Sequence, residues 1–208
     1  MNIDDFEAPD APETLKETLD MIFARQRDLM DKYKEIEQLP DPPLSLHHHS
    51  GQRIIRDFAW RTVEELTESY EAFKEFLEYQ DEVHRHHQIE ELADALHFIV
   101  ELLIFAGVTS TQCFNAVEDL SVHEVGAPDT MYWDATYELG IAMNFLRNKA
   151  WKKSHVPTDE GRFREAILRA FKAHYRIWFA FSGGDHDLMF NYYFKKSEVN
   201  KFRQRSEY

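Results

Sequence analysis

Two acidic motifs decide the fold of this chain: Glu65-Leu66-Thr67-Glu68 and Glu91-Leu92-Ala93-Asp94. Both lie in stretches whose apolar residues recur with helical spacing. Within each motif the two carboxylates are three residues apart, so at about 100° per residue they share one face of a helix. The motifs are also symmetric about residues 79 and 80. A helical hairpin that turns there would place Glu65 beside Asp94 and Glu68 beside Glu91, so that four carboxylates converge.

Four converging carboxylates call for a cation, because two unit charges about 4 Å apart repel by roughly 4 kcal/mol at an effective dielectric constant near 20. Oxygen ligands favour hard divalent ions, and Mg²⁺ is typically held by a few carboxylates together with substrate phosphates and water. The motifs therefore predict a magnesium site that a phosphate-bearing substrate completes. The alternative is that the acids form solvated helix faces, since a chain with 38 acidic residues contains such spacings by chance.

Composition narrows the class of protein further. At 208 residues the chain fits one domain with a sizeable core, and its formal charge of −14 argues against nucleic acid as a partner. A single cysteine, Cys113, favours a reducing compartment. The most apolar run, 96–107, is interrupted by His97 and Glu101 and is too short to cross a bilayer, and the acidic N-terminus does not resemble a secretory signal. We therefore expect a cytoplasmic protein without a membrane segment.

Helical periodicity recurs along the rest of the chain, and no alternating strand pattern of useful length is present. It predicts helices over about 13–36, 51–80, 86–106, 107–120, 132–152, 161–181 and 187–203. The predicted fold is all-α, a helical bundle in which two antiparallel helices carry the acidic motifs. Residues 1–12, which are acidic and contain two prolines, are expected to be a mobile segment, and residues 13–208 to form a single domain.

Two further features suit a nucleotide ligand. On the last helix Lys196, Asn200 and Arg203 form one stripe of hydrogen-bond donors, and lysine and arginine both bind phosphate oxygens. A solvated basic face favoured by the helix dipole is the alternative reading of this stripe. On the first helix Gln26 falls on the apolar face, where a long amide is either an ordinary core-edge residue or a ligand contact.

With these features in place, the sequence resembles the all-α nucleoside triphosphate pyrophosphatase superfamily, in particular its dimeric dUTPase branch and the related phage-type dCTPase/dUTPases. The segments 64–68 and 91–98 are similar to the two metal-binding motifs of that family, and 196–208 is similar to its phosphate-binding tail. The resemblance covers about residues 13–107 and 187–208. Much of 108–186 therefore looks like a helical insertion.

The resemblance implies hydrolysis of a pyrimidine deoxynucleoside triphosphate, dUTP first and dCTP second, to the monophosphate and pyrophosphate. The enzyme would be a homodimer in the cytoplasm, or in the host cytoplasm if a phage encodes it. Two or three Mg²⁺ ions, which Mn²⁺ could replace, would be held by the four carboxylates, and Glu65 or Glu68 would take the proton of the attacking water. By the same resemblance the substrate would be bound by Gln26, which contacts the base, and by Lys74, Lys196, Asn200, Arg203 and Tyr208.

The chain departs from the family pattern at two places. Phe73 and Phe76 replace tryptophans that are each followed by lysine, and only Lys74 is kept of the two lysines. In the tail Glu207 stands where a glycine is usual. The stacking role between the motifs and the closing geometry of the tail would differ accordingly.

Two other functions fit parts of the sequence. Carboxylates and histidines that face each other in a helical bundle also form di-iron sites, and His97 follows Asp94 by three residues as such a site requires. That pattern, however, needs a histidine after an acid on each of two helices, and only one is placed correctly. A non-enzymatic helical interaction protein is the second alternative, since the abundant aromatic residues suit an interface as well as a core.

Overall fold

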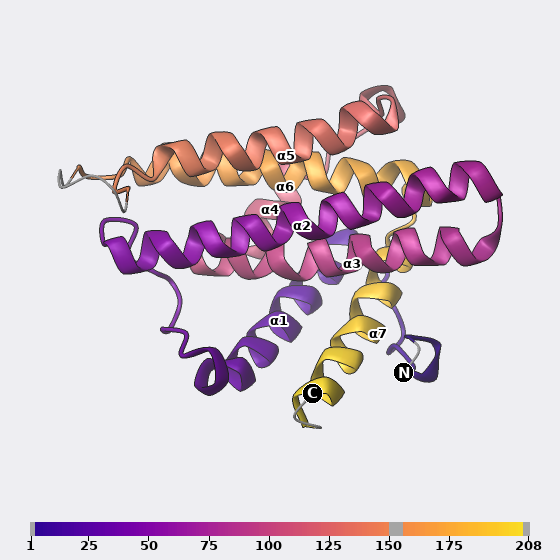
Figure 1. Cartoon of the computed structure of the whole chain (residues 1–208), viewed down its shortest axis with the longest axis horizontal. Coiled ribbons are helices and arrows are strands. Elements are labelled where there is room, and N and C mark those ends of the chain that lie inside the picture. The colour runs from indigo at the N-terminus through magenta and orange to yellow at the C-terminus, as the bar shows by residue number, and fades with distance from the viewer. Residues whose placement is uncertain (1–2, 150–155, 206–208) are drawn as a thin grey trace.

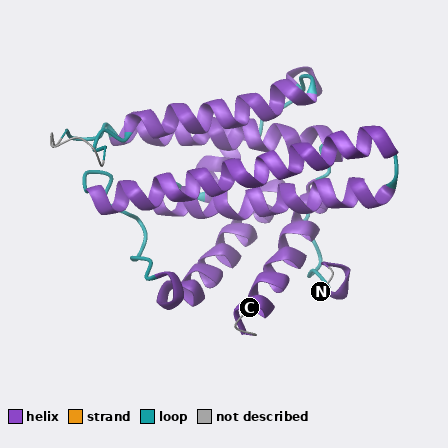
Figure 2. Cartoon of the chain, in the orientation of Figure 1, coloured by secondary structure: helices purple, strands orange, loops and turns teal. Residues whose placement is uncertain are grey.

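The computed structural model describes residues 3–149 and 156–205, which form seven α-helices and two short 3-10 helices without any strand. Figure 2 shows this helical content directly. The prediction of an all-α bundle is confirmed. In the described part of the chain no single helix is long and apolar enough to cross a membrane, and only α3 and α4 together, across a 119° bend, pass that test.

The helices lie in three layers (Figure 1). α2 (His49–Tyr79) and α3 (Glu82–Phe105) form the middle layer as an antiparallel pair, and α5 (Pro128–Phe145) pairs with α6 (Glu160–Ser182) above them. Below the middle layer, α1 (Leu15–Glu37) and α7 (His186–Arg205) run side by side. The short helix α4 (Ser110–Val117) contacts α1 and α6.

The hairpin between α2 and α3 turns where the symmetry of the acidic motifs predicts it. Gln80 ends α2 in the left-handed conformation, with a φ of 53°, and its N–H donates to the carbonyl of Phe76. Asp81 then caps α3 by accepting a hydrogen bond from the backbone N–H of His84 at 2.9 Å. A tight turn of this kind keeps the two helices in register along their length, which brings the motifs level.

The centre of the bundle is α3, because its second half is almost entirely apolar. Leu92, Leu96, Ile99 and Leu103 are fully buried, as are most residues between them. The neighbouring helices cover every side of this segment, and α1, α2, α6 and α7 all contact α3. A helix that is apolar on all sides is stable in water only when it is enclosed in this way.

Helix ends differ from the predicted ones where a local residue starts or stops the helix. The helix expected over 132–152 begins at Pro128, because proline suits the first turn of a helix, and ends at Phe145. Leu146 is already extended, and the following Asn148 donates its backbone N–H to Gln52 of α2 at 3.0 Å. The helix expected from 86 begins four residues earlier, at Glu82, because Asp81 supplies the cap.

The N-terminal segment packs against the last helix. Ile3 of the first 3-10 helix (Ile3–Asp5) is buried, and Lys195 lies 3.5 Å from Asp4. Residues 108–186 supply α4, α5 and α6, of which α5 packs along α2. The mobility of residues 1–12, the single domain over 13–208 and the insertion at 108–186 stay predictions.

Candidate functional site

Three carboxylates of the acidic motifs meet between α2 and α3. Oxygen atoms of Glu65, Glu91 and Asp94 all lie within 4.8 Å of one another, and each of the three side chains is half-buried. Glu65 of α2 and Asp94 of α3 lie together, as the hairpin symmetry predicts, and Glu91 of α3 completes the group. An all-oxygen set at this spacing fits a hard divalent cation such as Mg²⁺.

Glu68 does not join this group in the structure. Its side chain is exposed one turn further along α2. Its charge still acts on the site, since it is among the charges that raise the pKa of Glu65. Of the four carboxylates expected to converge, three do so.

The three acids repel one another in the absence of a cation. Burial, followed by the charges of Asp94, Glu68 and Glu91, raises the pKa of Glu65 to about 8. Burial also raises the pKa of Asp94 to about 6, although Lys196 opposes this rise. Carboxylates keep protons near neutral pH when too little positive charge lies near them. A bound divalent ion would supply that charge and favour their ionised forms.

Lys196 of α7 lies against this cluster. Its Nζ is 2.7 Å from Oδ2 of Asp94 and 2.7 Å from Oε1 of Glu90, and only 5% of its side chain is exposed. Although burial lowers the pKa of Lys196, the attraction of Asp94 and Glu90 outweighs it and raises the pKa. The lysine predicted to bind phosphate is thus placed at the candidate metal centre. Glu90 was not predicted, because nothing in the sequence links it to a residue of the last helix.

A cavity of about 180 Å³ extends from the carboxylates toward α1. Its lining includes Glu65 and Asp94 at one end and Gln26, Arg61 and Glu101 elsewhere. Asn200 of α7 also lines it. Two residues predicted to contact substrate, Gln26 and Asn200, therefore share one cavity with two of the predicted metal ligands.

Gln26 is held in place by a buried network. Its Oε1 accepts a hydrogen bond from the Tyr193 hydroxyl at 2.7 Å and lies 3.0 Å from Nδ1 of His97, and its Nε2 donates to Oε2 of Glu101 at 3.1 Å. Nε2 of His97 lies 3.2 Å from the carbonyl oxygen of Tyr193. Burial lowers the pKa of His97 to about 3, so its ring is neutral. A neutral imidazole has one N–H, so His97 donates to only one of these two oxygens. His97 is not part of the carboxylate group in the described residues, which disfavours the di-iron alternative.

The other predicted substrate residues lie elsewhere or outside the described part. Lys74 is exposed on α2, with its Nζ 5.2 Å from the centre of the Tyr70 ring, and does not line the cavity. The side chain of Arg203 and all of Tyr208 lie outside the described residues.

One contact at the site was not predicted from the sequence. Nε2 of His87 lies 3.1 Å from Oε1 of Glu91, which is four residues further along α3. This helical spacing was visible in the sequence.

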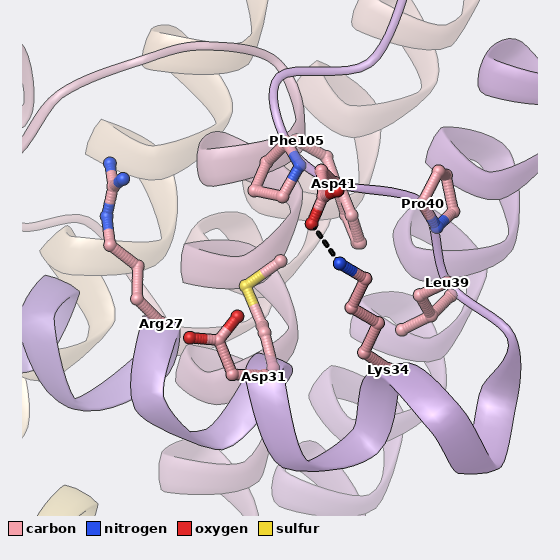
Figure 3. A pocket seen from close by; sticks show the side chains of 9 residues that line it. Arg27, Asp31, Lys34, Leu39, Pro40, Asp41 and Phe105 are labelled. Atoms are coloured by element: carbon pink, nitrogen blue, oxygen red, sulfur yellow. Dashed lines mark hydrogen bonds and ion pairs between the residues drawn. The ribbon is translucent and has the colours of Figure 1, made fainter.

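A second cavity, of about 150 Å³, lies beside the C-terminal half of α1 (Figure 3). Arg27, Lys34, Asp41 and Phe105 are among its lining residues, and an ion pair joins Lys34 to Asp41 across it. It shares no lining residue with the cavity at Gln26 and contains none of the motif carboxylates. We assign the candidate site to the first cavity alone.

Comparison with known proteins identifies the family of the chain. A family model described as dUTPase matches residues 58–208, a range that contains both acidic motifs, the segment 108–186 and α7. The comparisons with curated proteins and with solved structures found no match. The family match supports nucleotide hydrolysis of the dUTP or dCTP type in general. Since the match covers well over half of the sequence and the acidic hairpin is in place, the chain belongs to the all-α dUTPase family.

Proposed function

We propose that this protein is a Mg²⁺-dependent hydrolase that converts a pyrimidine deoxynucleoside triphosphate, dUTP first and dCTP second, to the monophosphate and pyrophosphate. One observation carries the proposal. Carboxylates from two antiparallel helices converge at one end of a cavity, and a rigidly held glutamine lies on the wall of the same cavity. Such a cavity suits a ligand with a charged phosphate end and a polar ring.

The metal would be held by Glu65, Glu91 and Asp94, and Mn²⁺ would substitute for Mg²⁺. When bound, Mg²⁺ neutralises the triphosphate, makes a coordinated water more acidic and stabilises charge in an in-line displacement. Glu65 and Glu68 are the candidate bases for the water's proton. Glu68 is the stronger of the two candidates, because it lies outside the group of carboxylates that would hold the metal.

The rest of the cavity would hold the nucleotide. Gln26 would contact the base, and Asn200 and Lys196 would contact the phosphates, since Asn200 lines the cavity and Lys196 contacts Asp94 from α7. Arg203, Tyr208 and Lys74 remain proposed phosphate-binding residues on the family resemblance alone. A homodimer likewise remains a proposal.

The test measures the release of pyrophosphate from each of the canonical deoxynucleoside triphosphates and from dUTP. We expect release from dUTP or dCTP that requires Mg²⁺ and that EDTA abolishes. Glu91→Gln should lower kcat by about 100-fold or more, because it removes a metal ligand and about 2.7 kcal/mol of transition-state stabilisation. Glu71→Gln, which changes an exposed acid elsewhere on α2, is the matched control and should leave kcat unchanged.

Two results would remove the proposal. The first is that the wild-type protein releases no pyrophosphate from any of these nucleotides with Mg²⁺ or Mn²⁺. The second is that Glu91→Gln is as active as Glu71→Gln.

A further inference from the structure

Glu101 is a buried carboxyl group whose hydrogen-bonding capacity is only half used. It lies seven residues after Asp94, on the same face of α3, and is 6% exposed. Oε2 accepts the hydrogen bond from Gln26, whereas Oε1 has no partner among the described residues and is not sealed from the cavity that Glu101 lines. An unpaired oxygen in a buried carboxyl is unfavourable unless a ligand or water pairs with it.

The groups around Glu101 do not supply that pair. Arg61 of α2 is engaged elsewhere, 3.0 Å from Glu37 and 3.1 Å from Asp57. From α7 the Tyr193 hydroxyl donates to Gln26, and His97 of α3 is neutral. None of these three side chains therefore competes with a ligand for Oε1.

The same neighbours set the protonation of the carboxyl group. Burial, followed by the charge of Glu37, raises the pKa of Glu101 to about 8, while Arg61 and the hydrogen bond from Gln26 act in the opposite direction. Both forms of the carboxyl group are therefore accessible near neutral pH. When a proton is present it lies on Oε1, because Oε2 is already the acceptor for Gln26.

Resting on the function proposed above, we propose that Glu101 determines base specificity by pairing its free oxygen Oε1 with ring nitrogen N3 of the pyrimidine. Uracil carries a hydrogen on N3 and donates it to an ionised carboxylate. Cytosine has a lone pair on N3 and accepts a hydrogen bond from a protonated carboxyl group. The protonation of Glu101 thus sets the preference: the neutral form selects cytosine and the ionised form selects uracil.

Binding of dUMP and dCMP to the full chain, measured by calorimetry in EDTA at pH 6.5 and 8.5, tests this inference without catalysis. In the wild-type protein the ratio of the Kd of dCMP to that of dUMP should rise by about tenfold between the two pH values, because a mismatched buried pair loses about 1–3 kcal/mol. The acids at the metal end also titrate, but they act on both nucleotides alike, so the ratio cancels their effect.

Glu101→Gln is the decisive variant, because an amide offers both a donor and an acceptor at every pH. Its Kd ratio should be constant between pH 6.5 and 8.5, whereas Glu71→Gln should behave as wild type. A constant ratio in the wild-type protein, or the same slope in Glu101→Gln, overturns the inference. If Glu101→Gln does not fold, the wild-type slope alone decides.

The outcome separates this inference from the proposed hydrolysis. If the Kd ratio depends on Glu101 while no pyrophosphate is released with Mg²⁺, the hydrolase proposal fails and the role of Glu101 stands. If pyrophosphate is released and the Kd ratio is constant, the hydrolase proposal stands and the role of Glu101 is refuted. If the wild-type protein binds neither monophosphate, the cavity is not a pyrimidine site and the role of Glu101 is refuted.

Discussion

Replacing Lys196 with methionine removes a buried ammonium group from the acidic cluster while keeping most of the apolar stem. In the structure this group contacts Asp94 and Glu90, each at 2.7 Å, and Glu65 and Glu91 lie close by. The variant therefore leaves several carboxylates together without a neighbouring cation. We expect a large loss of stability in the absence of metal.

The size of this loss follows from the burial of the pair. Removing one partner of a buried ion pair costs about 3–5 kcal/mol, because the other charge stays buried and unpaired. The side chain of Asp94 is 16% exposed and that of Glu90 is 29% exposed, so both retain some contact with water. We therefore expect the lower end, about 3 kcal/mol, which corresponds to a fall in Tm of about 6–12 °C for a chain of this length.

Urea unfolding at pH 7.5 in EDTA measures this loss. Lys32→Met, which removes an exposed ammonium group on α1, is the control and should change the free energy of unfolding by less than about 0.5 kcal/mol. Adding Asp94→Asn to Lys196→Met should recover part of the loss, because it removes an unpaired charge. Millimolar Mg²⁺ should stabilise Lys196→Met more than wild type. The reasoning is refuted if Lys196→Met is as stable as Lys32→Met, or if Asp94→Asn adds its full cost to Lys196→Met.

Three further predictions concern protonation and packing. Because the pKa values of Glu65 and Asp94 are raised to about 8 and about 6, protons compete with Mg²⁺, and calorimetry should show an affinity about 30-fold lower at pH 6.5 than at pH 8.5; an affinity independent of pH contradicts this. The pKa of Glu101 is higher in the folded than in the unfolded chain, so its contribution to stability is complete below about pH 4.5 and is lost as the pH rises through about 8. The free energy of unfolding of wild type should therefore fall by about 2 kcal/mol relative to Glu101→Gln between pH 6 and 8.5, and parallel pH profiles would refute this. Gln52→Leu should lower the free energy of unfolding by about 2–3 kcal/mol in urea titrations, because Gln52 donates to Leu46 and Thr158 and accepts from Asn148 while fully buried; a loss under about 0.5 kcal/mol would show that this network is dispensable.

The helices and the hairpin were predictable because they depend on local patterns. The acidic motifs are equidistant from the junction of Tyr79 and Gln80, and Gln80, in the left-handed conformation, ends α2. Helix ends were harder to place, since they depend on single capping residues such as Asp81 and Pro128 rather than on periodicity. At both of these residues the helix begins four residues before the predicted start.

The candidate site was predictable only in part. Spacing along one helix fixes the direction of a side chain to within a broad arc, and this was enough to bring Glu65, Glu91 and Asp94 together. It was not enough for Glu68, which is one turn further along and exposed. The contacts of Lys196 with α3 join residues about one hundred positions apart, and no periodic pattern in either helix contains that information.

The two polar residues within the most apolar run indicate where the cavity lies, although the periodicity of apolar residues alone does not use them. His97 and Glu101 break the most apolar segment of the chain, and both are buried on the side of α3 that meets Gln26. A position enclosed by apolar residues favours an apolar side chain, so a carboxyl group there lowers stability unless something pairs with it. The ring of His97 lies between Gln26 and Tyr193, whereas Glu101 keeps one oxygen open to the cavity. The two interruptions therefore differ in kind: His97 helps to fix the cavity wall, and Glu101 offers an oxygen to whatever the cavity holds.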